Sequence, residues 1–170
     1  MKNDYNIRER VGVSARYNHH LKEGEFMASV FDTAKYILYK KGRMSTWKLQ
    51  KLCYYSQAWA LAWTETPLFE EDFEAWANGP VCPELFNAHR GMDMISEREL
   101  KKGDRNNLND GEKGSIDIVL ETYGDMEPYD LRERTHHEAP WLNARNGLPE
   151  GAKSNNIISK DAMGEYYAGL

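Results

Sequence analysis

Apolar side chains recur at intervals of three and four residues in two long segments, which is the pattern of helices with one buried face. In residues 30–41 this stripe comprises Val30, Phe31, Ala34, Ile37 and Leu38. Ser29 precedes it and Asp32 follows three residues later, the arrangement of a capping box. Gly42 suits the left-handed conformation that often ends a helix. The pattern therefore predicts a first helix over residues 30–41.

The second segment predicts the longest helix, over residues 46–63. Its stripe comprises Leu49, Leu52, Cys53, Ser56, Trp59, Ala60 and Trp63. No Gly or Pro interrupts the segment, so the helix can run its full length without a break. We expect it to be the central helix of the fold. The opposite face is expected to be more polar. It carries Lys48, Lys51, Tyr55 and Ala62.

Four shorter segments also carry helix signals, and a further one predicts a single turn. The four cover residues 84–90, 110–123, 128–134 and 160–168, and the turn covers residues 140–145. Pro83 suits the first position of a helix. Asn109 with Glu112 forms a second capping-box pattern, and Ser159 is a typical cap residue.

Strand signals are weaker. Residues 68–77 alternate loosely between apolar and polar side chains, which predicts a short strand. Ile157 and Ile158 indicate a second brief strand, which we expect to pair beside residues 73–76. Residues 91–109 show no sustained period and many charges. We interpret them as a mobile connector with at most one turn of helix.

These elements predict a mainly α fold, a single compact helical domain of about six helices with a minor short β element. The domain is expected to cover residues 27–170. Residues 1–26 are rich in charge and lack an apolar stripe. We interpret them as an N-terminal extension that the domain does not need: a flexible arm, a short accessory helix or an upstream start.

Composition narrows the class of protein further. With 170 residues, 41% hydrophobic and 29% charged, the chain can form one ordinary globular core. Its net charge of −5 argues against general binding to nucleic acid and suits a partner with a basic face. No apolar run is long enough to span a membrane and no signal peptide begins the chain, so we expect a cytoplasmic protein.

The strongest hint of catalysis is the run Thr135-His136-His137-Glu138. Two imidazoles and a carboxylate are metal ligands, so a metal-dependent hydrolase is one hypothesis. Adjacent histidines rarely reach one ion, however, and the spacing of a helical zinc site is absent. The structural alternative, which we favour, is that Thr135 caps the turn and that His136 or Glu138 binds exposed backbone groups. No cofactor is expected.

Cysteine chemistry gives no stronger signal. Cys53 and Cys82 are too few for a disulfide framework or a zinc site. Cys53 lies in the apolar stripe of the second helix, where a thiol behaves as a small hydrophobic group.

Four polar-tipped side chains fall on the second helix: Gln50, Lys51, Tyr54 and Tyr55. Buried donors need partners, so we expect an internal network that joins this helix to residues 135–141. The alternative is that Lys51 and a tyrosine line a groove for a partner peptide.

Three separated motifs can be compared with known families. They comprise Leu49, Gln50, Lys51, Leu52, Tyr54 and Tyr55; Trp76, Gly79, Pro80 and Val81; and Thr135, His136, Glu138, Pro140 and Trp141. Together they resemble the SocA-type Panacea domain of phage-associated GepA-like proteins and of bacterial antitoxins. The resemblance implies a non-enzymatic antitoxin that binds a cognate protein toxin. It also implies a possible role as an adaptor for an ATP-dependent protease.

A surface for the toxin is predicted in the connector. Its candidate contacts are Met92, Met94, Ile95, Glu97 and Glu99. The three apolar side chains have no place in a helical stripe, and loops often hold partner contacts. We expect charge reversal at the two glutamates to weaken neutralisation. A nucleic-acid-binding regulator is the other alternative, although no helix-turn-helix or basic arm is evident in residues 27–170.

Overall fold

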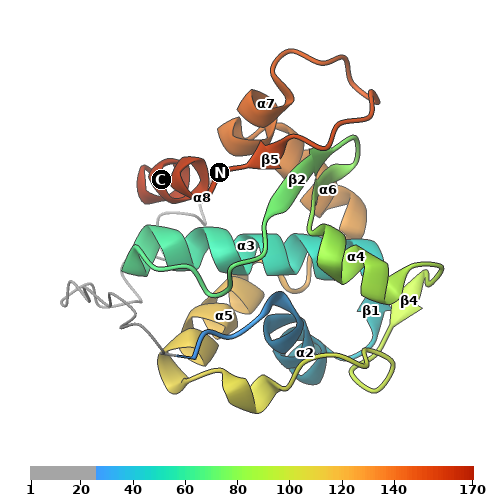
Figure 1. Ribbon diagram of the computed structural model, residues 1–170, viewed down its shortest axis with the longest axis vertical. Helices are drawn as coiled ribbons and strands as arrows, with labels where there is room; N and C mark the ends of the chain where they lie inside the picture. Colours follow the sequence, from blue (N-terminus) through green and yellow to red (C-terminus); the bar gives the residue numbers. More distant parts are fainter. Residues whose placement is uncertain (1–25) are drawn as a thin grey trace.

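The structure is a computed structural model that describes residues 26–170 (Figure 1). The expected extension, apart from its last residue, lies outside the described residues. Seven α-helices occur in the described part of the chain: α2 (Val30–Lys41), α3 (Thr46–Thr64), α4 (Pro83–His89), α5 (Asp110–Tyr123), α6 (Pro128–His136), α7 (Ala139–Arg145) and α8 (Lys160–Ala168). The mainly α prediction is therefore confirmed, with seven helices in place of about six.

Helix α3 crosses the middle of the molecule, and α2, α5, α6 and α8 pack around it (Figure 1). Its central position, expected from the long stripe, is confirmed. Lys51 and Tyr55, on its more polar face, are both buried. The reason is tertiary: because neighbours cover the helix on several sides, even its polar residues are enclosed.

The helix ends follow the local signals. Ser29 and Asp32 form the predicted capping box on α2, with the Asp32 amide donating to Ser29 Oγ. Asn109 and Glu112 form the second capping box, on α5. Gly42 ends α2 with a φ of 80°, as its position after the stripe predicts.

A three-stranded antiparallel sheet flanks α3. Its order is β3 (Gly79–Val81), β2 (Phe73–Trp76) and β5 (Ile157–Ile158). Phe73 lies opposite Ile158 and Glu74 opposite Ile157, which confirms the pairing predicted from sequence. The sheet brings the chain after α7 back beside the β2–β3 hairpin.

Residues 91–109 are built differently from the expected connector. Strand β4 (Met94–Ile95) pairs with β1 (Met44–Ser45), and a short 3₁₀ helix covers Arg105–Asn107. The Asp104 amide also donates to Asp32 Oδ1 on α2 at 2.7 Å. The segment is thus attached to the core by isolated contacts, which leave no periodic pattern in the sequence.

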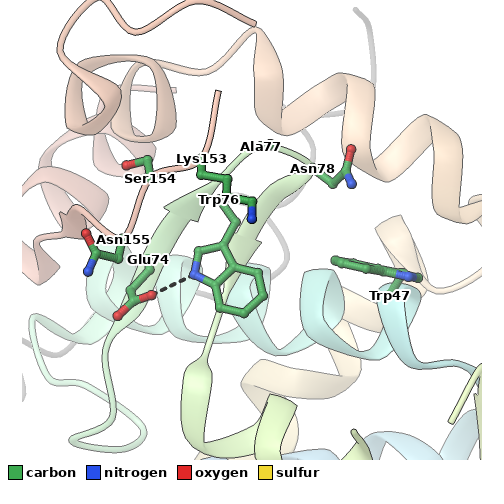
Figure 2. A pocket seen from close by; sticks show the side chains of 8 residues that line it. All are labelled: Trp47, Glu74, Trp76, Ala77, Asn78, Lys153, Ser154 and Asn155. Carbon is green, nitrogen blue, oxygen red and sulfur yellow. Dashed lines mark hydrogen bonds between the residues drawn. The ribbon is translucent and has the colours of Figure 1, made fainter. Parts of the chain in front are cut away.

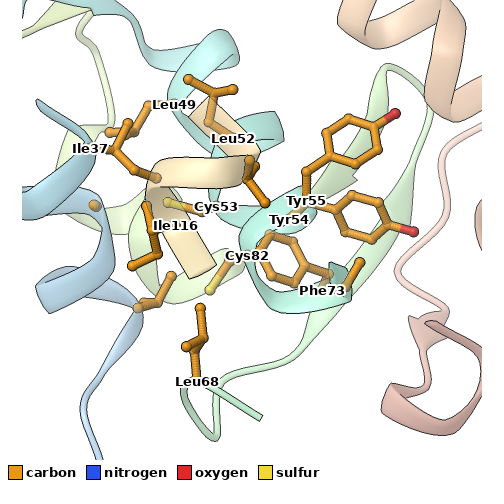
Figure 3. Close-up of a cluster of buried hydrophobic side chains, with 14 of the residues drawn as sticks. Ile37, Leu49, Leu52, Cys53, Tyr54, Tyr55, Leu68, Phe73, Cys82 and Ile116 are labelled. Atoms are coloured by element: carbon orange, nitrogen blue, oxygen red, sulfur yellow. The ribbon is translucent and has the colours of Figure 1, made fainter. Parts of the chain in front are cut away.

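The core combines aliphatic side chains with aromatic rings (Figure 3). Tyr54 packs edge-on against Tyr55 and Phe73, with ring centroids 5.5 and 5.4 Å apart. Cys53 and Cys82 are both buried and free. Among residues 26–170, no helix combines the length and the apolar character that a membrane span requires.

Candidate functional site

The three motif segments meet at Gly79, the first residue of β3, directly after the β2–β3 turn. Gly79 has a φ of 102°, a conformation that residues with a side chain rarely adopt. A Cβ at this position would lie 2.6 Å from Lys51 Cε and 2.9 Å from Thr135 Oγ1. The absence of a side chain therefore lets α3, the β2–β3 turn and the end of α6 approach one another.

Lys51 extends beneath this turn. Its Nζ donates a hydrogen bond of 3.0 Å to the carbonyl of Pro80, and the side chain is only 2% exposed. Burial, together with the positive charge of Arg132, lowers the pKa of Lys51 to about 7. The Nζ also lies 5.5 Å from the centroid of the Trp47 ring.

Gln50 holds the backbone just after the same turn. Its Oε1 accepts from the amide of Cys82 at 2.8 Å, and its Nε2 donates to the carbonyl of Cys82 at 3.2 Å. The second proton of Nε2 is directed at His89 Nε2, 3.1 Å away. Since an amide nitrogen can only donate, this ring nitrogen is the acceptor. Burial also lowers the pKa of His89. Gln50 is thus a structural link between α3 and the start of α4.

Glu138 forms the second link from α3. Its buried carboxylate accepts hydrogen bonds from Tyr55 of α3, at 3.1 and 3.2 Å, and from Tyr167 of α8. Arg134 lies within ion-pair distance, at 3.6 Å. Burial and the neighbouring carboxylate raise the pKa of both tyrosines well above 10. The predicted network is therefore present for Tyr55, whereas Gln50 and Lys51 bind residues 80–82. Tyr54 contributes ring packing against Tyr55, Phe73 and Tyr167 instead.

Thr135 and His136 occupy the end of α6. Thr135 Oγ1 donates to the carbonyl of Arg132 at 2.7 Å, so it bonds within the helix and the predicted capping role is wrong. The His136 ring stacks on Trp141, with centroids 3.9 Å apart and planes 8° from parallel. Burial, and secondarily Arg132, lower the pKa of His136 to about 4, which keeps the ring neutral near pH 7.

The His136, His137 and Glu138 side chains do not converge on one point. His136 faces Trp141, while His137 Nδ1 donates to the carbonyl of Glu133 at 2.7 Å and its ring is exposed. Glu138 is enclosed by tyrosines. Within residues 26–170, no group of three His, Cys, Asp or Glu side chains has the geometry to hold a metal ion. The three side chains therefore do not form the shared metal site that the hydrolase hypothesis requires.

Side chains of helix α7 form hydrogen bonds with backbone carbonyls of the sheet. Trp141 Nε1 donates to the carbonyl of Trp76 at 2.9 Å, and Arg145 donates to the carbonyl of Ala75 at 2.9 Å. Pro140 lies in the first turn of α7, and Trp141 is 4% exposed. These contacts fix the position of strand β2. They thereby also fix the position of the Trp76 indole, which belongs to this strand.

Two adjoining pockets open around Trp47 and Asn78, and we call them together the aromatic groove. The larger, of about 430 Å³, is lined by Trp47, Glu74, Trp76, Ala77, Asn78, Lys153, Ser154 and Asn155 (Figure 2). The smaller, of about 210 Å³, is lined by Trp47, Lys51, Asn78, Pro128, Tyr129 and Arg132. Figure 2 shows the indole of Trp76 in the larger pocket, its Nε1 directed at Glu74 and the ring of Trp47 beyond it. The shared residues make the two pockets one feature.

Sequence reasoning missed two aromatic residues of this groove, Trp47 and Tyr129. Their side chains are 42% and 66% exposed. Neither lies in the apolar stripe of its helix. An aromatic residue outside the stripe is expected on the surface, and this pattern could have identified both residues. Lys51 lines the smaller pocket, but the tyrosines of the alternative hypothesis, Tyr54 and Tyr55, are buried in the core, and the tyrosine beside Lys51 is Tyr129. Peptide binding in this pocket stays a prediction.

The predicted partner contacts in residues 91–109 have unequal surroundings. Ile95 is buried in the core, which corrects its proposed role as a surface contact. Met92 and Met94 are 39% and 38% exposed. Glu97 pairs with Arg105 at 3.4 Å, and Glu99 accepts from the amide of Ser96 at 2.7 Å. The exposed members of this set stay a prediction.

Comparison with known proteins gives one match. The family model described as "Antitoxin SocA-like, Panacea domain" matches residues 49–142. The match begins in α3 and ends in α7, so it contains all three motif segments that meet around Gly79. No curated protein and no solved structure matches the chain significantly.

Proposed function

The chain belongs to the family of SocA-like antitoxins with a Panacea domain, and from this premise we propose that it neutralises a cognate protein toxin by binding it directly. The observation that carries the proposal is the orientation of the motif side chains. Gln50 and Glu138 are buried and bind neighbouring segments of the chain with their side-chain polar atoms. Motif side chains that stabilise the fold in this way favour a framework that presents a surface to a partner protein.

The site chemistry also favours binding over catalysis. A general base must reach a substrate proton, but His136 is stacked and Glu138 is enclosed. The role of adaptor for an ATP-dependent protease, implied by the family resemblance, would follow toxin binding and is a further prediction.

Co-expression with the product of the adjacent gene tests this function. We expect the chain to restore the growth of cells that produce this toxin, and the two proteins to co-purify. Failure of the purified chain to bind that product would contradict the proposal.

A variant at His136 separates binding from turnover. His136→Phe keeps an aromatic ring to stack on Trp141 and removes both ring nitrogens. We therefore expect the folded variant to restore growth as the wild type does. Loss of rescue with unchanged circular dichroism and thermal unfolding would favour an enzyme.

A further inference from the structure

Lys51 is a buried cation with unused hydrogen-bonding capacity. An ammonium group has three donors, and one of them binds the carbonyl of Pro80. No carboxylate among residues 26–170 forms an ion pair with Lys51. A buried charge normally has a partner of opposite sign, and within residues 26–170 Lys51 has no such partner.

Arg132 adds a second positive charge to the same pocket. Its Nε donates to Asn78 Oδ1 at 3.2 Å, its Nη1 forms an ion pair with Glu133, and its Nη2 lies 3.9 Å from a carboxylate oxygen of the exposed Glu150. The Arg132 charge contributes to the lowered pKa of Lys51. An anion bound between these two cations would relieve their repulsion. A carboxylate fits, because it accepts hydrogen bonds from ammonium and guanidinium groups alike.

Aromatic side chains flank this cationic pocket and continue beyond it. Trp47 and Tyr129 line the pocket with Lys51 and are exposed, and Trp47 also borders the larger pocket that holds Trp76 (Figure 2). Trp, Tyr and Arg are the residue types that most often dominate binding at protein interfaces. The groove therefore offers a site for a charged group beside a site for an apolar one.

We propose that the aromatic groove binds an extended segment of the toxin, with a carboxylate between Lys51 and Arg132 and a neighbouring apolar side chain between Trp47 and Trp76. The proposal rests on the proposed antitoxin function and names the chemistry that the partner presents. The local positive charge stands out because the chain as a whole has a net charge of −5. The negative net charge of the chain would repel an anionic peptide, so its binding would depend on the local positive charge of the groove.

The first test uses peptides and requires no toxin. An acetylated, amidated peptide with the sequence Ala-Leu-Glu-Leu-Ala is titrated into the protein while the indole N–H signals are followed by NMR. The chain has five tryptophans, so the spectrum contains its own controls. We expect the signals of Trp47 and Trp76 to shift, and those of the buried Trp59 and of Trp63, which stacks on Trp59 outside the groove, to stay in place. The analogue with Gln in place of Glu should bind about tenfold more weakly or worse, because it lacks the charge-assisted contact.

Variants test the residues of the groove. Lys51→Met keeps the length and apolar stem of the side chain, and it should abolish the preference for the Glu peptide. Tyr129→Ala changes an exposed side chain and should weaken both peptides without affecting folding. Lys101→Met and Tyr39→Ala are the matched controls outside the groove and should bind as the wild type does.

The outcomes distinguish this inference from the antitoxin function. Equal binding of the Glu and Gln peptides, or no shift of Trp47 and Trp76, would overturn the groove assignment even if the toxin is neutralised. Binding of free glutamate as tight as that of the peptide would overturn the assignment to an extended segment. Selective peptide binding without any toxin binding would support the groove and reject the antitoxin function. If the toxin is bound, Tyr129→Ala should weaken that complex by about tenfold or more, as expected for an interface anchor.

Discussion

At the scale of single residues, Lys51 makes a prediction about pH. Its pKa is about 7 in the folded protein and about 10.5 when exposed, so between these values the unfolded chain holds the additional proton. Stability therefore rises with pH across this window, because the cost of burying a charged amine disappears. Urea unfolding at pH 7 and pH 9.5 should show this gain in the wild type, and Lys51→Met should lack it. An equal pH dependence in both proteins would mean that Lys51 is not buried as a free amine.

His136 makes the corresponding prediction in acid. Its folded pKa of about 4 lies below the ordinary value of 6.5, so the unfolded chain binds this proton first. The contribution of His136 to stability is complete above pH 6.5 and is lost as the pH falls towards 4. Thermal unfolding between these limits should decline less steeply in His136→Phe than in the wild type. Parallel declines would contradict the buried, neutral ring.

At the scale of residues, the sequence indicates which side chains need hydrogen bonds but not which atoms they bind. The need of Gln50, Lys51 and Tyr55 for hydrogen bonds follows from residue type and helical position. Which backbone atoms they meet depends on the β2–β3 turn, and no local pattern specifies where that turn packs. For this reason the network was expected at residues 135–141 but is divided between that segment and residues 80–82.

At the scale of elements, the β2–β3 turn should tolerate no side chain at Gly79. Gly79→Ala forces an unfavourable φ and places a methyl group against Lys51 and Thr135. Strain of about 1–3 kcal/mol and crowding of a similar size should together lower the free energy of unfolding by about 2–6 kcal/mol.

Gly151→Ala is the matched control for this turn. Gly151 also has a positive φ, 81°, but a Cβ there would meet nothing within 4 Å. Gly151→Ala should therefore lower the free energy of unfolding only by the backbone strain. Similar losses in the two variants, measured by urea unfolding, would show that the close approach at Gly79 contributes nothing.

Helices were predictable here because their ends are encoded locally. The capping boxes at Ser29 and Asn109 lie within four residues of the helices they begin. Residues 91–109 could not be predicted in this way. Ile95, Leu100 and Leu108 are each buried through separate tertiary contacts, and three isolated apolar residues produce no period.

At the scale of the whole molecule, one core joins α3 to α7. Trp59 and Trp141 are 1% and 4% exposed and belong to the same buried cluster. Replacing either by Ala should lower the free energy of unfolding by about 3–5 kcal/mol, the usual cost of removing a large aromatic side chain from a core. Each variant should still unfold in a single transition in urea, because the two residues share one cooperative unit. Two separate transitions in either variant would contradict a continuous core.

The candidate site was predictable in part at this scale. The three motifs indicated which segments matter, and the family match supports that choice. The exposed surface that they frame was not predictable, because Trp47 and Tyr129 lie in different helices and adjoin only after folding. A sequence shows which aromatic residues fall outside a stripe but not which of them share a pocket.

The contact at Gly79 has a consequence for how such a scaffold can diversify. Because Lys51 and Thr135 close around a position without side-chain atoms, the framework is determined by interior residues that tolerate little change. Tyr129 and Lys153 are exposed and lie outside this framework, whereas the ring of Trp47 contacts Lys51. The exposed positions of the groove can therefore be exchanged while the fold is kept, because surface substitutions usually change stability little. If the groove binds the toxin as proposed, such exchanges would alter its specificity around a fixed Lys51.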